Sequence, residues 1–164
     1  MNQAALLDVL AGIQFLRGVS REHLEQIASV AEVHDYGTSE IAFREGEVAD
    51  SVYLVVSGKL SLELSPSTTD CKHLVSVGPG EMLGWSALVE NPRFAATAVV
   101  IEPARLVRID GNRLRAICDE DPQFGYEFTR RTMRALAKRL TSTWTELSRL
   151  HVSHYLPVTA PSDE

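Results

Sequence analysis

The feature that most constrains this chain is a series of short β-type runs between residues 41 and 109. Leu60, Leu62 and Leu64 alternate with polar residues, which is the pattern of a strand with one buried face. Turn residues such as Gly, Pro and Asn separate the runs at roughly every 8–12 residues. The pattern predicts an antiparallel sandwich or barrel. The runs, rich in Val, Ile, Leu and Thr, are 41–44, 52–56, 60–64, 74–77, 95–101 and 106–109.

Helical patterns flank the β-type runs. Apolar residues recur at helical spacing within residues 1–31, where Ser20 is the predicted N-cap of a second helix. Asp110 is the predicted cap of a helix that follows the strands. Asp121 followed by Pro122 is a strong start signal for a longer helix. The predicted order is therefore helices, strands and helices.

The long helix carries a possible dimer seam. Its apolar positions step by three and four residues, which is the spacing of a coiled coil. We expect a homodimer through this helix, and packing of the same face on the chain's own barrel is the alternative. The seam consists of Met133, Leu136, Leu140, Thr143, Leu147 and Leu150.

Charge is distributed unevenly along the chain. The net charge is −6, with −8 in residues 1–121, +4 in residues 122–151 and −2 in residues 152–164. An acidic chain is a poor general nucleic-acid binder, because phosphate contacts require clustered positive charge. We interpret the basic stretch as the solvated face of a helix, and a contact to phosphate or to an acidic partner stays open. Its clustered members are Arg130, Arg131, Arg134, Lys138 and Arg139.

Composition narrows the function classes. No apolar run approaches the roughly 18 residues that cross a bilayer, and residues 1–12 lack Lys and Arg, so we expect a cytoplasmic protein that does not contact membranes. Two cysteines are too few for a disulfide framework, and His151 with His154 does not complete a metal site. Gly84-Trp85-Ser86 is similar to a serine nucleophile elbow but lacks the final Gly, so we expect no enzyme.

One segment, residues 78–97, suits an anionic ligand. It contains several glycines, then one predicted helical turn over residues 86–90, then Arg93 beside small residues. Backbone N–H groups at a helix N-terminus attract anions, and an arginine supplies charge and paired donors for phosphate. Thr97 adds a hydroxyl group. A purely structural glycine turn is the alternative for this segment.

Several motifs together resemble the cyclic nucleotide-binding domain of the catabolite-activator/FNR (CRP/FNR-like) superfamily. The motifs are Phe43-Arg44-Glu45-Gly46-Glu47, Asp50-Ser51-Val52-Tyr53-Leu54-Val55-Val56-Ser57-Gly58 and Pro79-Gly80-Glu81. The resemblance implies a mainly β fold, an eight-stranded jelly roll with flanking helices and a long C-terminal helix. It implies a single domain over residues 1–151: helices in 1–31, the jelly roll in 32–110, and C-terminal helices in 111–151. We expect residues 152–164 to form a flexible tail.

The resemblance places the family's phosphate-binding cassette on residues 80–97, with two departures. Trp85 stands where the family has the Glu that binds the ribose 2′-hydroxyl. Counted back from Thr97 without a gap, Phe94 stands at the phosphate Arg position, and Arg93 lies one residue earlier, where a strand would turn its side chain to the opposite face. The alternative is a loop one residue shorter at 90–92, which would restore Arg93 to that position. On the long helix, Thr143 matches the Thr that contacts adenine in the catabolite-activator branch. The implied ligand-binding residues are Leu83, Gly84, Trp85, Ser86, Ala87, Leu88, Arg93, Phe94, Ala95, Ala96, Thr97 and Thr143.

The functional expectation is a small-molecule sensor. Its ligand would be cAMP, cGMP or a related anion, and its signal would pass through the C-terminal helix to an output protein that the sequence does not identify. The alternative is a ligand-free interaction or dimerisation module that has lost nucleotide binding. A haem sensor with His34 or His73 as axial ligand is a further alternative. Only 14 residues follow Leu150, so we expect no DNA-binding domain and no direct DNA binding.

Overall fold

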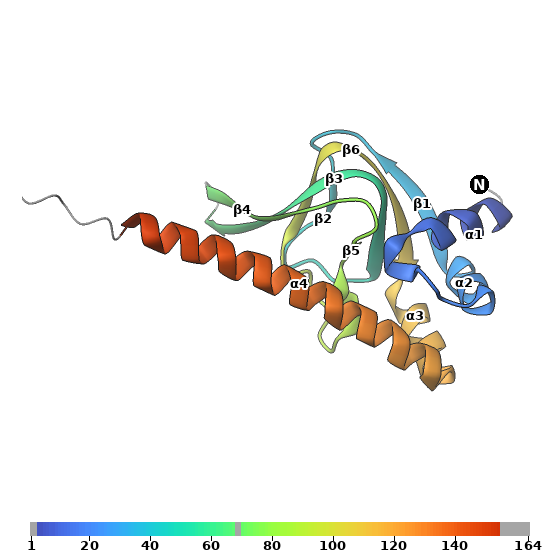
Figure 1. The fold of residues 1–164 in the computed structure, drawn as a ribbon. Helices are drawn as coiled ribbons and strands as arrows, with labels where there is room; N and C mark the ends of the chain where they lie inside the picture. Colours follow the sequence, from blue (N-terminus) through green and yellow to red (C-terminus); the bar gives the residue numbers. More distant parts are fainter. Residues whose placement is uncertain (1–2, 68–69, 155–164) are drawn as a thin grey trace, which may run out of the picture.

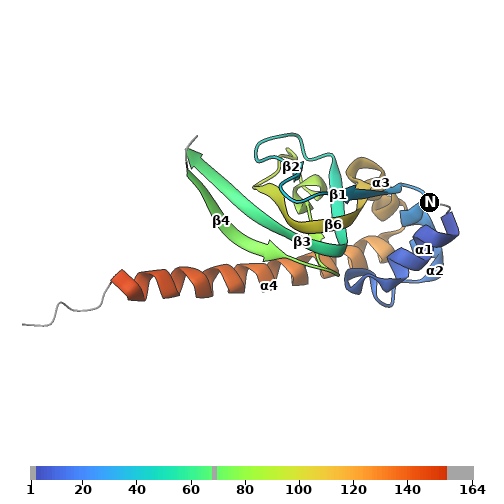
Figure 2. The same cartoon turned by 90° about the horizontal axis from the view of Figure 1, so that it is seen from above.

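The body of the protein is an antiparallel sheet of six strands, in a computed structural model that describes residues 3–67 and 70–154. The strands are β1 (Ala31–Tyr36), β2 (Ile41–Phe43), β3 (Ser51–Ser67), β4 (Asp70–Val77), β5 (Met82–Leu83) and β6 (Thr97–Asp110). Their order is β1-β6-β3-β4, with β2 paired to β6 and β5 paired to β3. The sheet curls into a barrel-like body (Figure 1, Figure 2), which confirms the predicted jelly roll.

Local capping signals set the helix starts. The Ser20 hydroxyl accepts a hydrogen bond from the His23 backbone N–H at 3.2 Å, Asp110 accepts one from Arg113 at 2.8 Å, and Asp121 accepts one from the Phe124 N–H at 3.0 Å. All three predicted caps are therefore confirmed. The helices are α1 (Gln3–Gly12), the 3₁₀ turn η1 (Gln14–Leu16), α2 (Arg21–Ala28), the 3₁₀ turn η2 (Trp85–Leu88), α3 (Gly111–Glu120) and α4 (Pro122–His154).

Two strands are longer than the sequence pattern predicted. The runs 52–56 and 60–64 were expected to be separate strands, but both belong to β3, which continues through residues 57–59 with register shifts in its pairing to β6. Gly58 permits this because it has φ +83°, and a Cβ there would lie 2.2 Å from the Pro103 carbonyl oxygen. Because β3 and β6 span 17 and 14 residues, each replaces two consecutive strands of the eight that were implied.

Helix α4 crosses one flank of the barrel. Phe124 and Phe128 are buried near its start, and the ring of Phe128 meets Phe15 edge-on with centroids 5.4 Å apart. The second oxygen of Asp121 lies 2.8 Å from His23 Nε2, which ties α2 to the start of α4. The Phe124 N–H and His23 hold the pKa of the Asp121 carboxyl below its usual value. Farther along, α4 runs beside β4 (Figure 1).

The predicted dimer seam is divided in the structure. Met133 and Leu140 are exposed, whereas Leu136 and Thr143 are half-buried. Leu136 and Thr143 are thus less accessible than Met133 and Leu140, and a dimer through the predicted seam stays a prediction. The side chains of Leu147 and Leu150 lie outside the described residues. The exposed apolar positions instead follow the sequence Met133, Ala137, Leu140 and Trp144.

The end of α4 also differs from the expectation. The helix continues to His154, three residues beyond the predicted end at 151, and residues 155–164 lie outside the described part of the chain. Within the described residues, no helix combines the length and the apolar character needed to cross a membrane.

Candidate functional site

The predicted cassette, residues 80–97, turns sharply where β5 ends. Gly84 follows β5 with φ +73°, and a Cβ at this position would lie 2.7 Å from the Ser51 carbonyl oxygen. The left-handed conformation turns the chain directly into η2, where the Ala87 N–H donates to the Gly84 carbonyl at 3.1 Å. Only glycine fits this turn without a clash, so the backbone geometry explains Gly84 whether or not a ligand binds.

An aromatic cluster occupies the centre of the cassette. The rings of Phe94 and Phe43 are stacked with centroids 4.0 Å apart, and Tyr53 lies 5.3 Å from Phe43 and 6.5 Å from Phe94. Phe94 is 5% exposed and Phe43 is 6% exposed. Desolvation by burial raises the pKa of the Tyr53 hydroxyl. Phe94, which the gapless count places at the family's phosphate Arg position, is therefore part of the hydrophobic core.

The two polar anchors proposed from the sequence are engaged elsewhere. Arg93 is exposed, and its Nη1 donates to the Gly46 carbonyl at 2.7 Å. The Thr97 hydroxyl accepts a hydrogen bond from the Glu45 backbone N–H at 3.0 Å. Both side chains thus fasten the β2–β3 loop to the end of the cassette, Arg93 from the segment before β6 and Thr97 from the first residue of β6.

A small cavity remains between these elements. Its volume is about 30 Å³, enough for one or two water molecules and far below the roughly 300–1,000 Å³ of small-molecule pockets. Six of the predicted ligand residues line it: Gly84, Trp85, Ser86, Phe94, Ala95 and Ala96.

The other predicted residues do not line this cavity. Arg93 and Thr97 have the partners described above. Leu83 and Ala87 are buried in the core and Leu88 is half-buried against it. The Thr143 hydroxyl donates to the Arg139 carbonyl at 3.0 Å, a bond within α4.

Arg139 is a cavity residue that the sequence analysis did not assign to the site. It reaches the cavity from α4 and donates from Nη2 to the Met82 carbonyl at 2.8 Å. Desolvation by burial lowers the pKa of its guanidinium, and the charge of Glu81 opposes this effect. Phe43 and Leu62 also line the cavity, and the sequence analysis predicted neither of them as a site residue. Periodicity alone could not have predicted Arg139 as a cavity residue, because the other members of its basic run were interpreted as a solvent-exposed helix face.

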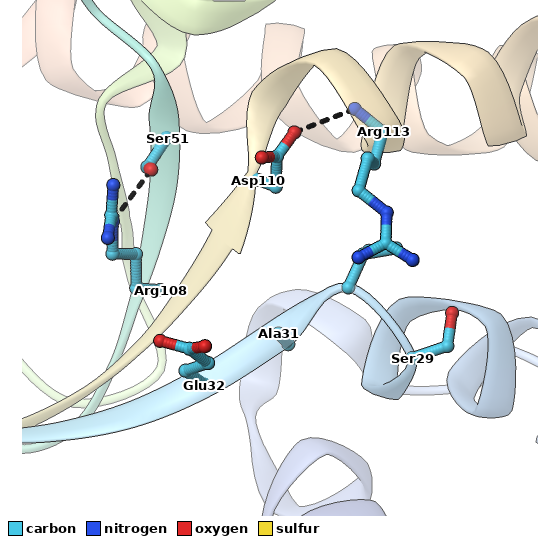
Figure 3. A pocket seen from close by; sticks show the side chains of 8 residues that line it. Ser29, Ala31, Glu32, Ser51, Arg108, Asp110 and Arg113 are labelled. Atoms are coloured by element: carbon cyan, nitrogen blue, oxygen red, sulfur yellow. Dashed lines mark hydrogen bonds between the residues drawn. The ribbon is translucent and has the colours of Figure 1, made fainter.

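A second concavity, lined by polar side chains, lies at the junction of α2, β1, β6 and α3. Its volume is about 180 Å³ (Figure 3). The Arg108 guanidinium donates to Ser51 Oγ at 2.8 Å and pairs with Asp50 at 3.0 Å. Asp110 accepts the capping bond at the start of α3. These groups are used to join elements of the fold, so we assign no ligand here.

Metal-binding and redox-active side chains do not gather in the described part of the chain. No group of three or more His, Cys, Asp or Glu residues there is arranged to hold a metal ion. His34 lies 3.3 Å from Glu32, and His73 Nδ1 lies 2.6 Å from Ser61 Oγ. Burial raises the pKa of the Cys118 thiol to about 11, which keeps it protonated at neutral pH.

Comparison with known proteins agrees with this architecture. The chain is 25% identical over 143 residues to the CRP-like cAMP-activated global transcriptional regulator of Mycobacterium tuberculosis, covering 87% of this chain and 62% of that protein. The chain thus spans less than two thirds of that relative. The Thermus thermophilus catabolite activator protein is 25% identical, with a TM-score of 0.66, over 84% of this chain and 63% of that chain.

A further structure shares the fold at lower identity. A cyclic nucleotide-binding domain from Methylobacillus flagellatus superposes with a TM-score of 0.74 over 96% of this chain and 86% of that chain, at 15% identity. The family profile "cyclic nucleotide-binding domain" matches residues 33–121, which is more than half of the chain. That match includes β1 to α3, the cassette and the aromatic cluster. The chain therefore belongs to the cyclic nucleotide-binding domain family, a family of regulatory domains rather than of enzymes.

Proposed function

We propose that this protein is a regulatory interaction module that acts through α4 and whose cassette is filled by its own side chains. The stacking of Phe94 on Phe43 carries this proposal, because it places an apolar ring where the family binds phosphate. A cavity of about 30 Å³ supports it, since no nucleotide fits such a volume. In this function, α4 makes the contacts and the jelly roll holds it in place.

Arg139 favours a second candidate, a cyclic nucleotide sensor. It is a charged side chain that lines the cassette cavity, and its guanidinium could bind a phosphate if the aromatic cluster moved aside. Several relatives are named for cAMP or cGMP, including a cAMP-dependent protein kinase regulatory subunit from Dictyostelium discoideum, 26% identical over 114 residues. This candidate requires the cavity to open.

Thermal unfolding with millimolar cAMP or cGMP separates the two candidates. We expect no change in Tm for the module with the filled cassette. A ligand at 100 times its Kd would add about 2.7 kcal/mol of stability, or about 5–10 °C for a chain of this size. A shift of that size that disappears in Arg139→Ala and persists in Arg134→Ala would establish the sensor and refute the filled cassette.

The exposed face of α4 is the proposed contact surface. Met133, Ala137, Leu140 and Trp144 follow one another at steps of four, three and four residues, and Trp144 is 61% exposed. This is the spacing of a coiled-coil seam, and it lies on the side of α4 away from Phe124 and Phe128. We propose that a second copy of the chain covers this seam in a homodimer.

Light scattering tests the dimer. We expect the mass of two chains at tens of micromolar protein, and the mass of one chain for the variant L140E/W144E, because two carboxylates would be buried in the seam. The matched control is T141E/T145E, which adds the same charge at exposed positions of α4 outside the seam. A single-chain mass for the unsubstituted protein, or equal dissociation of both variants, would contradict the proposal.

A further inference from the structure

A broad groove separates α4 from η1 and from the β4–β5 turn. Its volume is about 700 Å³, within the range of small-molecule pockets and much larger than the cassette cavity. Only two carboxylates line it, Glu81 and Glu127. The groove is therefore strongly basic on a chain that is acidic overall. Its cationic side chains are Arg17, Arg130, Arg131, Arg134, Lys138 and Arg139.

Some of these cations build the walls of the groove. Arg131 is 16% exposed, and its Nη1 donates to the carbonyls of Phe15 and Arg17, both at 2.9 Å. Glu127 accepts from Arg130 at 2.9 Å and pairs with Arg131 at 3.1 Å. These bonds fix η1 to α4, so the groove is preformed.

Other cations face the groove with little compensation. Arg134 is exposed and has no partner among the described residues. The Lys138 side chain is 76% exposed, and its Nζ lies 3.7 Å from Glu81 Oε1. Arg130, Arg134 and Lys138 follow one another at intervals of four residues on one ridge of α4. Like charges at this spacing repel one another and destabilise a helix, so an anion bound along the ridge would relieve their repulsion.

Two buried donors at the same groove also lack an acceptor. The Nε–H groups of Arg130 and Arg131 are buried, and neither has a hydrogen-bond partner in the described part of the structure. Buried polar groups are normally hydrogen-bonded, so these two donors are an exception. Both are covered by protein atoms and belong to the wall of the groove, and the exposed side chains of Arg134 and Lys138 are the part of the ridge that a ligand can reach.

The geometry points to a binding site for a small molecule that carries two or more adjacent phosphates. Guanidinium groups bind phosphate oxygens through paired, charge-assisted hydrogen bonds, and a lysine adds a mobile point charge. The ridge carries three cations in a row, and this arrangement fits a ligand with several linked phosphates better than a ligand with one phosphate. A concave volume of this size favours a small molecule over a protein segment. A ligand here would bridge α4 and η1, and the groove shares Arg139 with the cassette cavity.

Calorimetric titration with inorganic pyrophosphate at constant ionic strength tests this site. We expect one-to-one binding that is tighter than binding of inorganic phosphate. The variant R134Q/K138Q should weaken it at least about tenfold, because it removes two charge-assisted contacts. Both substituted side chains are exposed, and an unchanged Tm would show that the variant is folded.

A variant with the same change in net charge provides the control. R113Q/R115Q removes two arginines of α3, which does not line the groove, and it should bind pyrophosphate as the unsubstituted protein does. Equal weakening in both variants, or no heat at millimolar pyrophosphate, would overturn the assignment. Binding of a hexaglutamate peptide without binding of pyrophosphate would also overturn it, in favour of an acidic protein partner. Titrations with cAMP and cGMP test the cassette separately, so the two proposals can fail independently.

Discussion

Replacing Phe94 with alanine is expected to lower the free energy of unfolding by about 3–5 kcal/mol, as measured by guanidinium denaturation. The side chain is almost fully buried and stacks on Phe43, so its removal loses apolar burial and an aromatic pair and leaves a cavity. A loss of this size would be a large fraction of the total stability of a typical domain, which is about 5–15 kcal/mol. It would also show that the cassette position now serves the core.

Two other substitutions make the Phe94 experiment interpretable. Phe94→Leu keeps much of the apolar volume and should cost clearly less than alanine. Val48→Ala alters an exposed side chain in the adjoining loop and should stay within about 0.5 kcal/mol of the unsubstituted protein. A cost for Phe94→Ala as small as that of Val48→Ala would mean that the aromatic cluster does not hold the cassette together.

Replacing Gly58 with alanine should cost about 2–5 kcal/mol, the sum of a left-handed backbone penalty and an overpacking penalty. The added Cβ would lie 2.2 Å from the Pro103 carbonyl oxygen and 2.5 Å from Ala104 Cα. Because these are backbone atoms of β6, the neighbouring strand would have to move. Urea denaturation of the purified variant measures the loss.

Gly46 offers a matched comparison for Gly58. It has φ +80°, but a Cβ there would meet nothing within 4 Å. Gly46→Ala should therefore show only the backbone penalty of about 1–2 kcal/mol. Similar losses of unfolding free energy in the two variants would mean that β3 and β6 separate easily at Gly58. The close packing at the bulge would then contribute little to the stability of the barrel.

The sequence predicted those parts of the fold that depend on neighbouring residues. Ser20, Asp110 and Asp121 cap helices through bonds to residues three positions away, so their role is readable locally. The continuity of β3 through Gly58 was not readable, because it depends on pairing with β6 more than forty residues later. A Gly between two polar residues marks a turn and a bulge equally well in sequence.

For the candidate site, the sequence predicted a connection between strands but not which side chains fill it. Gly84 and the small residues after Phe94 lie in the segment that joins β5 to β6, and the site itself stays a prediction. Whether Phe94 fills the cavity depends on Phe43, which comes from another strand. The groove was missed for a similar reason, since the basic run was interpreted as solvated. Only its position opposite η1 makes it one wall of a concave surface.

The length of α4 has a mechanical consequence. At 1.5 Å per residue its 33 residues extend for about 50 Å, and its buried rings lie near one end. If the helix pivots near Phe128, a tilt of about 5° would displace its far end, about 39 Å away, by about 3 Å. A tilt too small to disturb the packing of the barrel would thus move the C-terminal end of α4 by about the size of a side chain.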